Sequence, residues 1–147
     1  MTLTAKFLAQ RIAFEQAYED GRWERLKPYF TDDMTYEVMN MPFHCVIEGV
    51  DAFAAGLKWS TDRFDKLCVR EVGFDRRLAE EGNNVVSHSG IRFTYNGSPP
   101  IATRLWEIAT FRDGLIDRII DIYDPGDAER FNDWMAQWGE GLDPRYQ

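Results

Sequence analysis

The sequence predicts a single α+β domain in which helices precede an antiparallel sheet. Apolar residues recur with the period of a helix up to about residue 64 and with the period of a strand after it. Clusters of turn residues then divide the second part into strands that follow one another directly, at 81–84, 96–100 and 113–114. Helices followed by a strand meander are typical of an α+β fold.

Length and composition agree with one globular domain spanning residues 1–147. The chain has 147 residues, of which 44% are hydrophobic and 29% are charged, enough to bury one core. Lys and Arg total 17 against 25 Asp and Glu, so the net charge is −8. Because nucleic-acid affinity depends on Lys and Arg neutralising phosphates, we expect no nucleic-acid partner.

Nothing in the sequence predicts a membrane span, a metal site or a cofactor. No apolar run approaches the ~20 residues that cross a bilayer, and the N-terminus lacks the apolar core of a signal peptide. Cys45 and Cys68 do not have metal-ligand spacing, and only two histidines occur. The glycine motifs of nucleotide binding are absent as well. We therefore expect a reduced, cytoplasmic protein with no membrane partner, no metal and no cofactor.

The first half of the chain is predicted to be mainly helical. A helix is expected over 3–19, where Leu8 and Ile12 lie four residues apart, and a shorter one over 22–30. A short strand over 34–39 and an irregular apolar loop over 40–46 follow. Asp51 is a plausible N-cap for a third helix, whose apolar stripe runs from Phe53 to Phe64.

The second half is predicted to form strands and one last helix. The turn signals separate strands at 66–80, 84–96, 99–112 and 115–124, which would form an antiparallel meander. A helix over 127–138 carries four large apolar residues on one face. The tail after Gly139 is expected to be loose.

Two of these strands are apolar on both faces, which bears on oligomeric state. The segments 101–109 and 115–124 place Ile, Leu, Trp or Tyr on either side. An antiparallel sheet usually exposes one face to water, and the helices can cover only one side. We therefore predict a homodimer through the outer sheet face. The alternative is that aromatic residues from elsewhere in the chain cover that face.

Asp121 is the leading catalytic candidate, because it interrupts an apolar strand between Ile120 and Ile122. A carboxylate in such a place is costly unless it is hydrogen-bonded, paired or neutralised by a raised pKa. A carboxyl group poised in this way is suited to general acid or base chemistry. An Asp at a frayed strand edge or in a subunit salt bridge is the alternative.

Other polar residues on the predicted strands are further candidates. His88 alternates with Gly90 and Arg92 on a polar, loosely filled strand face, and imidazole can shuttle a proton near neutral pH. The Tyr36 phenol can hydrogen-bond a substrate oxygen. His44 lies in an apolar loop, while Arg92 and Glu107 would point into a cavity or form solvent-side ion pairs. A structural role remains open for each of them.

The face that Glu107 occupies depends on the turn at Asp113-Gly114. A two-residue loop would put Trp106 opposite Asp121, whereas a three-residue loop would put Leu105 there and bring Glu107 to the same face. The sequence leaves both registers open.

Three segments together resemble the NTF2-like superfamily, in its SnoaL-like branch. They are the helical opening running into Leu26–Tyr36, the segment Ile47–Phe53, and the closing hairpin from Phe111 that leads to Ile120–Asp124. The resemblance covers about residues 3–138. It implies a cone-shaped, curved antiparallel or mixed sheet wrapped around the N-terminal helices, a cystatin-like α+β barrel with a deep pocket.

The same resemblance implies cofactor-independent acid–base chemistry on a hydrophobic substrate. Members include polyketide cyclases, limonene-1,2-epoxide hydrolase, ketosteroid isomerase and scytalone dehydratase, and others only bind partners. The tyrosine and last-strand acid of the epoxide hydrolase fall on Tyr36 and Asp121. Its asparagine falls on Val38, and its arginine and aspartate fall on His88 and Gly90, so epoxide hydrolysis does not carry over. The resemblance favours the three-residue hairpin loop.

The sequence therefore predicts a cofactor-independent lyase or isomerase acting on a small hydrophobic, aromatic molecule by elimination or aldol-type chemistry. Asp121, His88 and Tyr36 are expected to be catalytic. The expected substrate-binding residues are His44, Arg92, Glu107, Leu105, Tyr123 and Trp106. A cyclase or epoxide-type hydrolase is the alternative enzyme, and a small-molecule-binding or interaction domain is the non-enzymatic one.

Overall fold

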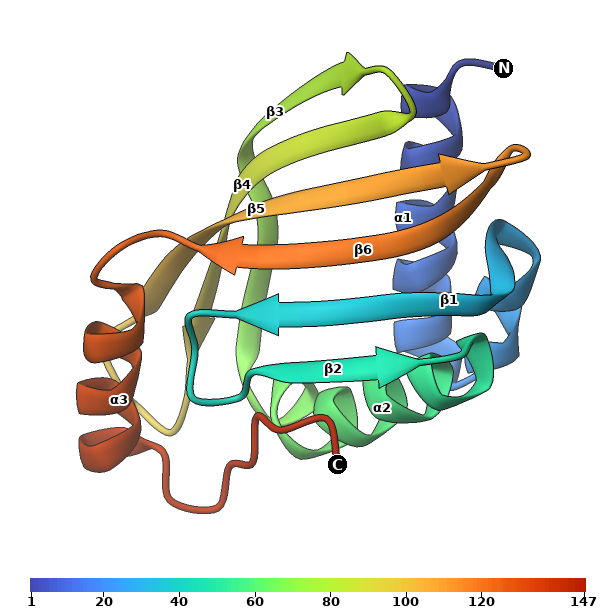
Figure 1. Cartoon of the computed structure of the whole chain (residues 1–147). Coiled ribbons are helices and arrows are strands. Elements are labelled where there is room, and N and C mark those ends of the chain that lie inside the picture. Colours follow the sequence, from blue (N-terminus) through green and yellow to red (C-terminus); the bar gives the residue numbers. More distant parts are fainter.

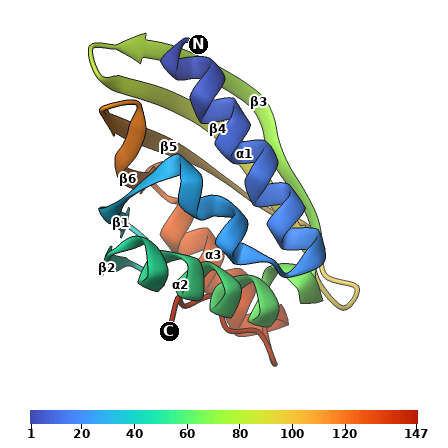
Figure 2. The same cartoon turned by 90° about the vertical axis from the view of Figure 1, so that its right-hand side faces the viewer.

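The chain folds into one six-stranded curved sheet with two long helices on its concave side (Figures 1 and 2). The computed structural model describes all residues from Met1 to Gln147. The helices are α1 (Leu3–Asp20), α2 (Val50–Arg63) and α3 (Asp127–Trp138), with short 3-10 helices η1 (Trp23–Tyr29) and η2 (Asp65–Leu67). The strands are β1 (Phe30–Met39), β2 (Cys45–Glu48), β3 (Val69–Glu81), β4 (Asn84–Thr94), β5 (Ile101–Arg112) and β6 (Leu115–Tyr123).

The strand order is β2-β1-β6-β5-β4-β3, so the last strand in the chain lies near the centre of the sheet. Strands β3 to β6 form the antiparallel meander that the sequence predicts. Strand β1 inserts between β2 and β6 and runs parallel to β6, which makes the sheet mixed. The predicted α+β class with a curved, mixed sheet around N-terminal helices is therefore confirmed. The sheet stays open at β2 and β3.

Several sequence-based boundaries differ from the structure. The first strand begins at Phe30 rather than at residue 34, and part of the expected loop over 40–46 forms the edge strand β2. In α1 the buried face carries Phe7, Gln10, Ala13 and Ala17, whereas Ile12 is 62% exposed. The sequence did not show which face of this helix is buried, because large aromatic residues such as Phe14 and Tyr18 lie next to the stripe of Leu8 and Ile12. No helix is long and apolar enough to cross a membrane.

The C-terminal tail is fixed rather than loose, which corrects the sequence-based prediction. The backbone N–H of Asp143 donates to the carbonyl of Arg63, and the Ser60 hydroxyl donates to the carbonyl of Pro144 at 3.3 Å. Gly56 on α2 allows close approach, because a Cβ there would lie 3.3 Å from the Tyr146 carbonyl oxygen. The tail thus returns beside α2 (Figure 1). Its Tyr146 lines the cavity described below.

The β5–β6 hairpin adopts a register that neither sequence-based alternative contained. Asp113 and Gly114 form a two-residue turn with φ angles of 53° and 82°, the left-handed pair that type I′ turns require. The pairing then shifts by one residue between Thr110 and Phe111, where Asp117 is an extra residue in β6. This bulge puts Glu107 directly opposite Asp121, in place of Trp106 or Leu105.

Gly114 anchors this register, so we predict that Gly114→Ala lowers the free energy of unfolding by about 1 kcal/mol. An alanine at φ 82° is strained, and its Cβ would lie 2.7 Å from Lys6 Nζ. Urea unfolding measures the loss. Gly114→Asn is the matched control, because it adds the same Cβ yet tolerates left-handed backbone and should lose less. Equal stability of the alanine variant and the unmodified chain would contradict the assignment.

Candidate active site

A cavity of about 130 Å³ lies between the concave face of the sheet and the helices α1 and α2. An engineered cavity of about 150 Å³ accommodates benzene, so this space suits a single ring. Its apolar wall includes Phe14, Phe53 and Leu57 from the two helices. Tyr36, Leu105, Glu107, Asp121 and Tyr123 line it from the sheet, and Tyr146 lines it from the tail.

Asp121 is buried to 5% exposure in the wall of this cavity. Its Oδ2 accepts a hydrogen bond of 2.6 Å from the Tyr36 hydroxyl, which lies on the neighbouring strand β1. Its Oδ1 is buried without a hydrogen-bond partner. No N–H or O–H group of the chain donates to Oδ1, although Asp121 can share a hydrogen bond with the Glu107 carboxyl when one of the two is protonated, so Oδ1 is the oxygen that a substrate or a water can reach.

Burial raises the pKa of Asp121 well above its ordinary value, and the like charge of Glu107 raises it further. The Tyr36 hydrogen bond opposes this rise. Two carboxyl groups opposite each other on adjacent strands cannot both be ionised without a large penalty. The pair therefore holds a proton at a pH where isolated carboxyl groups have lost theirs. Such a pair can deliver a proton and accept one.

A chain of phenols continues from Asp121 to the tail. The Tyr146 and Tyr36 hydroxyl oxygens are 3.2 Å apart, and because Tyr36 donates its proton to Asp121, Tyr146 is the donor between them. The two rings meet edge to face with centroids 5.5 Å apart. Burial raises the pKa of both phenols, so they remain neutral donors. Tyr36 and Tyr146 thereby hold the Asp121 carboxyl in one orientation.

A second, smaller cavity of about 80 Å³ adjoins the first. Tyr123 and Tyr146 line both cavities, together with Ser60, Asp65 and Ile91. Burial raises the pKa of Asp65 to about 6, while the charge of Arg70 opposes the rise. The ring of Tyr146 packs against Phe43 at 6.4 Å between centroids, toward the second cavity. The tail residue therefore forms part of the wall between the two spaces.

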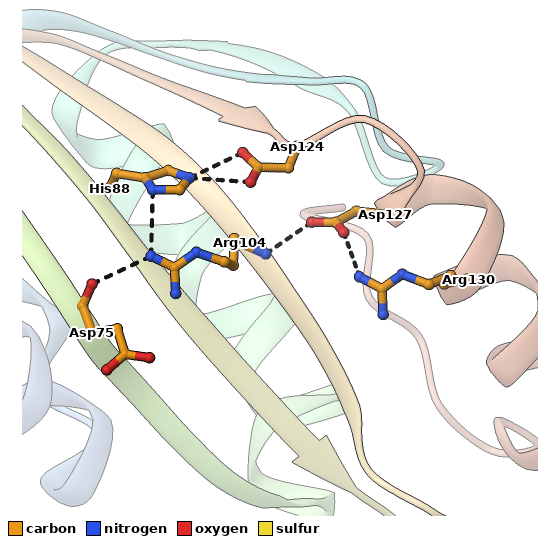
Figure 3. Close-up of polar contacts among 6 residues, drawn as sticks. All are labelled: Asp75, His88, Arg104, Asp124, Asp127 and Arg130. Atoms are coloured by element: carbon orange, nitrogen blue, oxygen red, sulfur yellow. Dashed lines mark hydrogen bonds and ion pairs between the residues drawn. The ribbon is translucent and has the colours of Figure 1, made fainter.

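His88 does not lie beside Asp121, so its sequence-based placement in the pocket is wrong. It pairs with Trp106 across strands and stacks on that ring on the convex face, with centroids 4.4 Å apart. Its Nε2 donates to the Asp124 carboxylate at 3.0 Å, and its Nδ1 accepts from Arg104 at 3.3 Å (Figure 3). The polar face of β4 that carries His88 is the convex face of the sheet and not the pocket face that the sequence predicts.

Three further predicted residues lie outside the cavity. Trp106 is 45% exposed on the convex face, because the bulge turned Glu107 inward instead. Arg92 pairs with Glu71 and covers the Phe74 ring on that same face. His44 is exposed in the turn between β1 and β2, where its Nδ1 lies 3.1 Å from the Met41 carbonyl oxygen.

The convex face also holds a polar network that joins three elements (Figure 3). The Arg104 guanidinium donates to the Asp75 carbonyl at 3.3 Å, as well as to His88. The Arg104 backbone N–H donates to Asp127 Oδ2 at 2.8 Å, and Asp127 also pairs with Arg130 on α3. Through these contacts α3 and a bend in β3 are tied to the middle of the sheet.

Several cavity residues were not predicted from the sequence, because no local pattern marks them: Gln10, Asp65, Arg76 and Tyr146. Five buried side-chain nitrogen or oxygen atoms lack a hydrogen-bond partner, and three of them belong to cavity residues: Gln10 Oε1, Arg76 Nε and Asp121 Oδ1. Unsatisfied groups concentrated in one cavity indicate a ligand site. No group of three His, Cys, Asp or Glu side chains is arranged to hold a metal ion.

Residues 12–119 match the family model of the SnoaL-like domain. Among solved structures, an LEH-like epoxide hydrolase from M. tuberculosis is similar with 19% identity and a TM-score of 0.62, covering 86% of this chain and 88% of that one. An NTF2-like protein from Anabaena variabilis ATCC 29413 is similar with 16% identity and a TM-score of 0.68, covering 87% and 97%. TerC, co-crystallised with polyporic acid, is similar with 15% identity and a TM-score of 0.66, covering 89% and 98%. No curated protein matches the chain in sequence.

The burial of Asp121 makes a prediction about stability and pH. Its pKa is higher in the folded chain than the ~3.9 of an unfolded Asp, so protonation favours the fold. That contribution is complete below about pH 4 and is lost as the pH rises through the folded pKa, at no more than about 1.4 kcal/mol per pH unit. We expect Asp121→Asn to remove this loss and to be at least as stable as the unmodified chain at pH 8.

Urea unfolding between pH 4 and pH 8 measures this dependence. The control is Asp113→Asn, an exposed carboxyl at a left-handed turn position that asparagine also tolerates. Its stability curve should run parallel to that of the unmodified chain. A parallel curve for Asp121→Asn would show that Asp121 has an ordinary pKa in the folded state.

Proposed function

The chain belongs to the SnoaL-like domain family, and from the carboxyl pair in its cavity we propose that it is a cofactor-independent acid–base enzyme. Its substrate would be a small, hydrophobic, ring-containing molecule. The observation that carries this proposal is Asp121, which is buried, hydrogen-bonded on one oxygen, unpaired on the other and directly opposite Glu107. The proposed reaction class is that of a lyase or isomerase.

The two carboxyl groups would divide the work of proton transfer. Asp121 is deeply buried and retains its proton, so it serves as the general acid. Glu107 lies directly opposite Asp121 in the same cavity wall, so it would serve as the general base that takes a proton from the substrate. In an elimination, Glu107 takes a proton from carbon, a C=C bond forms, and the departing hydroxyl group takes the proton of Asp121. In an isomerisation, the proton returns to a different carbon.

Tyr36 acts in this scheme by holding Asp121. Its hydrogen bond to Oδ2 leaves Oδ1 as the oxygen that carries the transferable proton. The apolar wall of Phe53 and Leu57 excludes water and so strengthens the electrostatic interactions of the pair. His88, expected from sequence to share the proton transfer, has no part in it because it lies on the convex face.

A hydrolase or cyclase would use the same pair differently. A water held between Asp121 Oδ1 and Glu107 could attack an epoxide, and the likeness to an epoxide hydrolase fold favours testing this. A cyclase would take a proton from carbon and close a ring onto a carbonyl. These reactions differ from elimination in where solvent atoms end up.

We predict that the protein catalyses exchange of carbon-bound hydrogen with solvent. Incubation in D₂O with a panel of aromatic alcohols and ketones, followed by mass spectrometry, should show deuterium in a substrate or loss of water or formaldehyde. Asp121→Asn and Glu107→Gln should each slow this by about 10²–10⁴-fold, the usual contribution of a general acid or base. Asp117→Asn should keep the full rate, since Asp117 is on the same strand but accepts from Thr31 outside the cavity.

The panel also separates the alternatives. Incorporation of ¹⁸O from solvent into a diol product, with no deuterium on carbon, would replace the lyase proposal with a hydrolase. Tight retention of a ring compound with no turnover, and no effect of Asp121→Asn, would identify a binding domain instead.

We also propose that a second copy of the chain covers the convex face of the sheet. Apolar residues pair across strands there, at Ile108 with Ile120 and at Trp106 with Ile122. Glu37 and Arg118 lie beside this stripe with opposite charges, which suits a two-fold interface between identical surfaces. The free thiols of Cys45 and Cys68 fit a reducing, cytoplasmic setting for such a dimer.

Sedimentation should accordingly show a dimer for the unmodified chain and a monomer for Ile120→Glu, because a buried carboxylate at the centre of the interface has no partner. Leu67→Glu is the control, since Leu67 is 51% exposed in η2, away from the sheet face, and should leave the dimer intact. A monomeric unmodified chain would refute the dimer.

A further inference from the structure

Two arginines at the opening of the cavity form no ion pair within the chain. Arg11 on α1 and Arg76 on β3 line both the cavity and the surface groove that adjoins it. Arg70 is different, because the Glu15 carboxylate binds it at 2.9 Å and 3.0 Å. In a chain with 25 acidic residues against 17 basic ones, positive charge left unpaired at a cavity mouth is available to a ligand.

Arg76 is also incompletely hydrogen-bonded. Its Nε is buried without an acceptor. A buried N–H without a partner carries the full cost of its lost hydration, and an anionic acceptor would restore that bond with charge assistance. Burial and the like charge of Arg11 lower the pKa of Arg76, while the negative charges of Glu107 and Glu15 oppose this decrease.

The backbone of β3 is distorted in the segment that carries Arg76. The pairing with β4 shifts between Val72 and Phe74 and again between Phe74 and Arg77. Gly73 and Asp75 have φ angles of 73° and 51°, in the left-handed region that strands do not use. Two irregularities within the six residues from Val72 to Arg77 are unusual, and in strands such features occur where a side chain is redirected.

The redirected side chain is Arg76. In a regular strand, Val72, Phe74 and Arg76 would share one face. Here Val72 and Arg76 line the cavity, whereas the ring of Phe74 covers Gly90, where a Cβ would lie 2.2 Å from it, and contacts the convex-face Arg92. Glycine suits position 73 because its φ of 73° is one that L side chains rarely adopt, and a Cβ there would also lie 2.8 Å from Arg76 Nη2.

The charges around the cavity give a bound anion one orientation. Asp121 and Glu107 lie in the wall formed by β6 and β5, and Asp65 lies in the wall beside η2. These acidic groups disfavour a carboxylate deep inside. Arg11 and Arg76 stand where the cavity meets the surface groove, and the Glu15 carboxylate near them is already engaged by Arg70. A negative group is therefore favoured at the mouth and disfavoured at the carboxyl pair.

We propose that Arg76, with Arg11 beside it, binds a carboxylate group carried by the substrate, whose ring occupies the cavity. The substrate class is thus a small aromatic acid. A guanidinium matches a carboxylate with two parallel hydrogen bonds, and about 130 Å³ holds one ring. This deepens the proposed function by naming the substrate class of the same site, and it rests on that function only for the assumption that the ligand is a substrate.

Binding of benzoate and of its neutral counterpart benzamide tests the proposal. Their affinities are measured by NMR titration at pH 7 with the unmodified chain, Arg76→Gln, Arg76→Lys and Arg77→Gln. Arg77 is the matched control, because it is the next residue, exposed and paired opposite His88 on the convex face. We expect benzoate to bind the unmodified chain at least about tenfold more tightly than benzamide.

The variants should separate charge from packing. Arg76→Gln should abolish the preference for benzoate while leaving the affinity for benzamide unchanged, and Arg76→Lys should retain part of the preference. Arg77→Gln should match the unmodified chain. Equal affinities for the two ligands, no binding of either, or a preference that survives Arg76→Gln would overturn the proposal.

The outcome is independent of the proposed catalysis. If benzoate binds more tightly than benzamide in a way that depends on Arg76, and no deuterium exchange occurs in the panel, the carboxylate site is supported and the proposed enzyme activity is refuted. Exchange on neutral ketones, with equal binding of benzoate and benzamide, would refute the carboxylate site alone.

Discussion

Asp121 is buried in the middle of the sheet, directly opposite Glu107 on the adjacent strand. A carboxyl group in the centre of a sheet is stable only if it is hydrogen-bonded or keeps its proton, and this one does both. Tyr36 must lie on the adjacent strand to supply the bond, so β1 must insert beside β6. The bulge at Asp117 must set the register, so that Glu107 faces the same way.

Local patterns in the sequence predicted the fold class and the meander, and they singled out Asp121, which the structure places in the cavity wall. Turn residues mark the hairpins unambiguously, and a charged residue inside an apolar strand is conspicuous in any register. The turn residues could not predict the hairpin register, because the bulge at Asp117 lies in β6, beyond the turn that the sequence marks. One extra residue changed the partner of Asp121 from Trp106 to Glu107.

The errors over His88, Arg92 and Trp106 share one physical cause. Polar residues on a strand face do not by themselves identify a pocket wall, because the cavity wall of this chain mixes hydrophobic with polar and charged residues and the water-facing side of the sheet carries polar residues too. Ionisable side chains more commonly occupy the side that meets water. Tyr146 and Arg76 were not predicted for another reason. The folded tail places Tyr146 at the cavity, and two irregularities in β3 place Arg76 there.

The polar network on the convex face is connected to the cavity through β3. Arg104 receives its orientation from His88, and His88 from Asp124, while the same guanidinium donates to the carbonyl of Asp75. Asp75 is the left-handed residue directly before Arg76. Strained backbone persists only where its surroundings hold it, and these contacts hold it from the side away from the cavity. His88, which the sequence predicted to be catalytic, thus helps to stabilise the segment of β3 that places Arg76 at the cavity mouth.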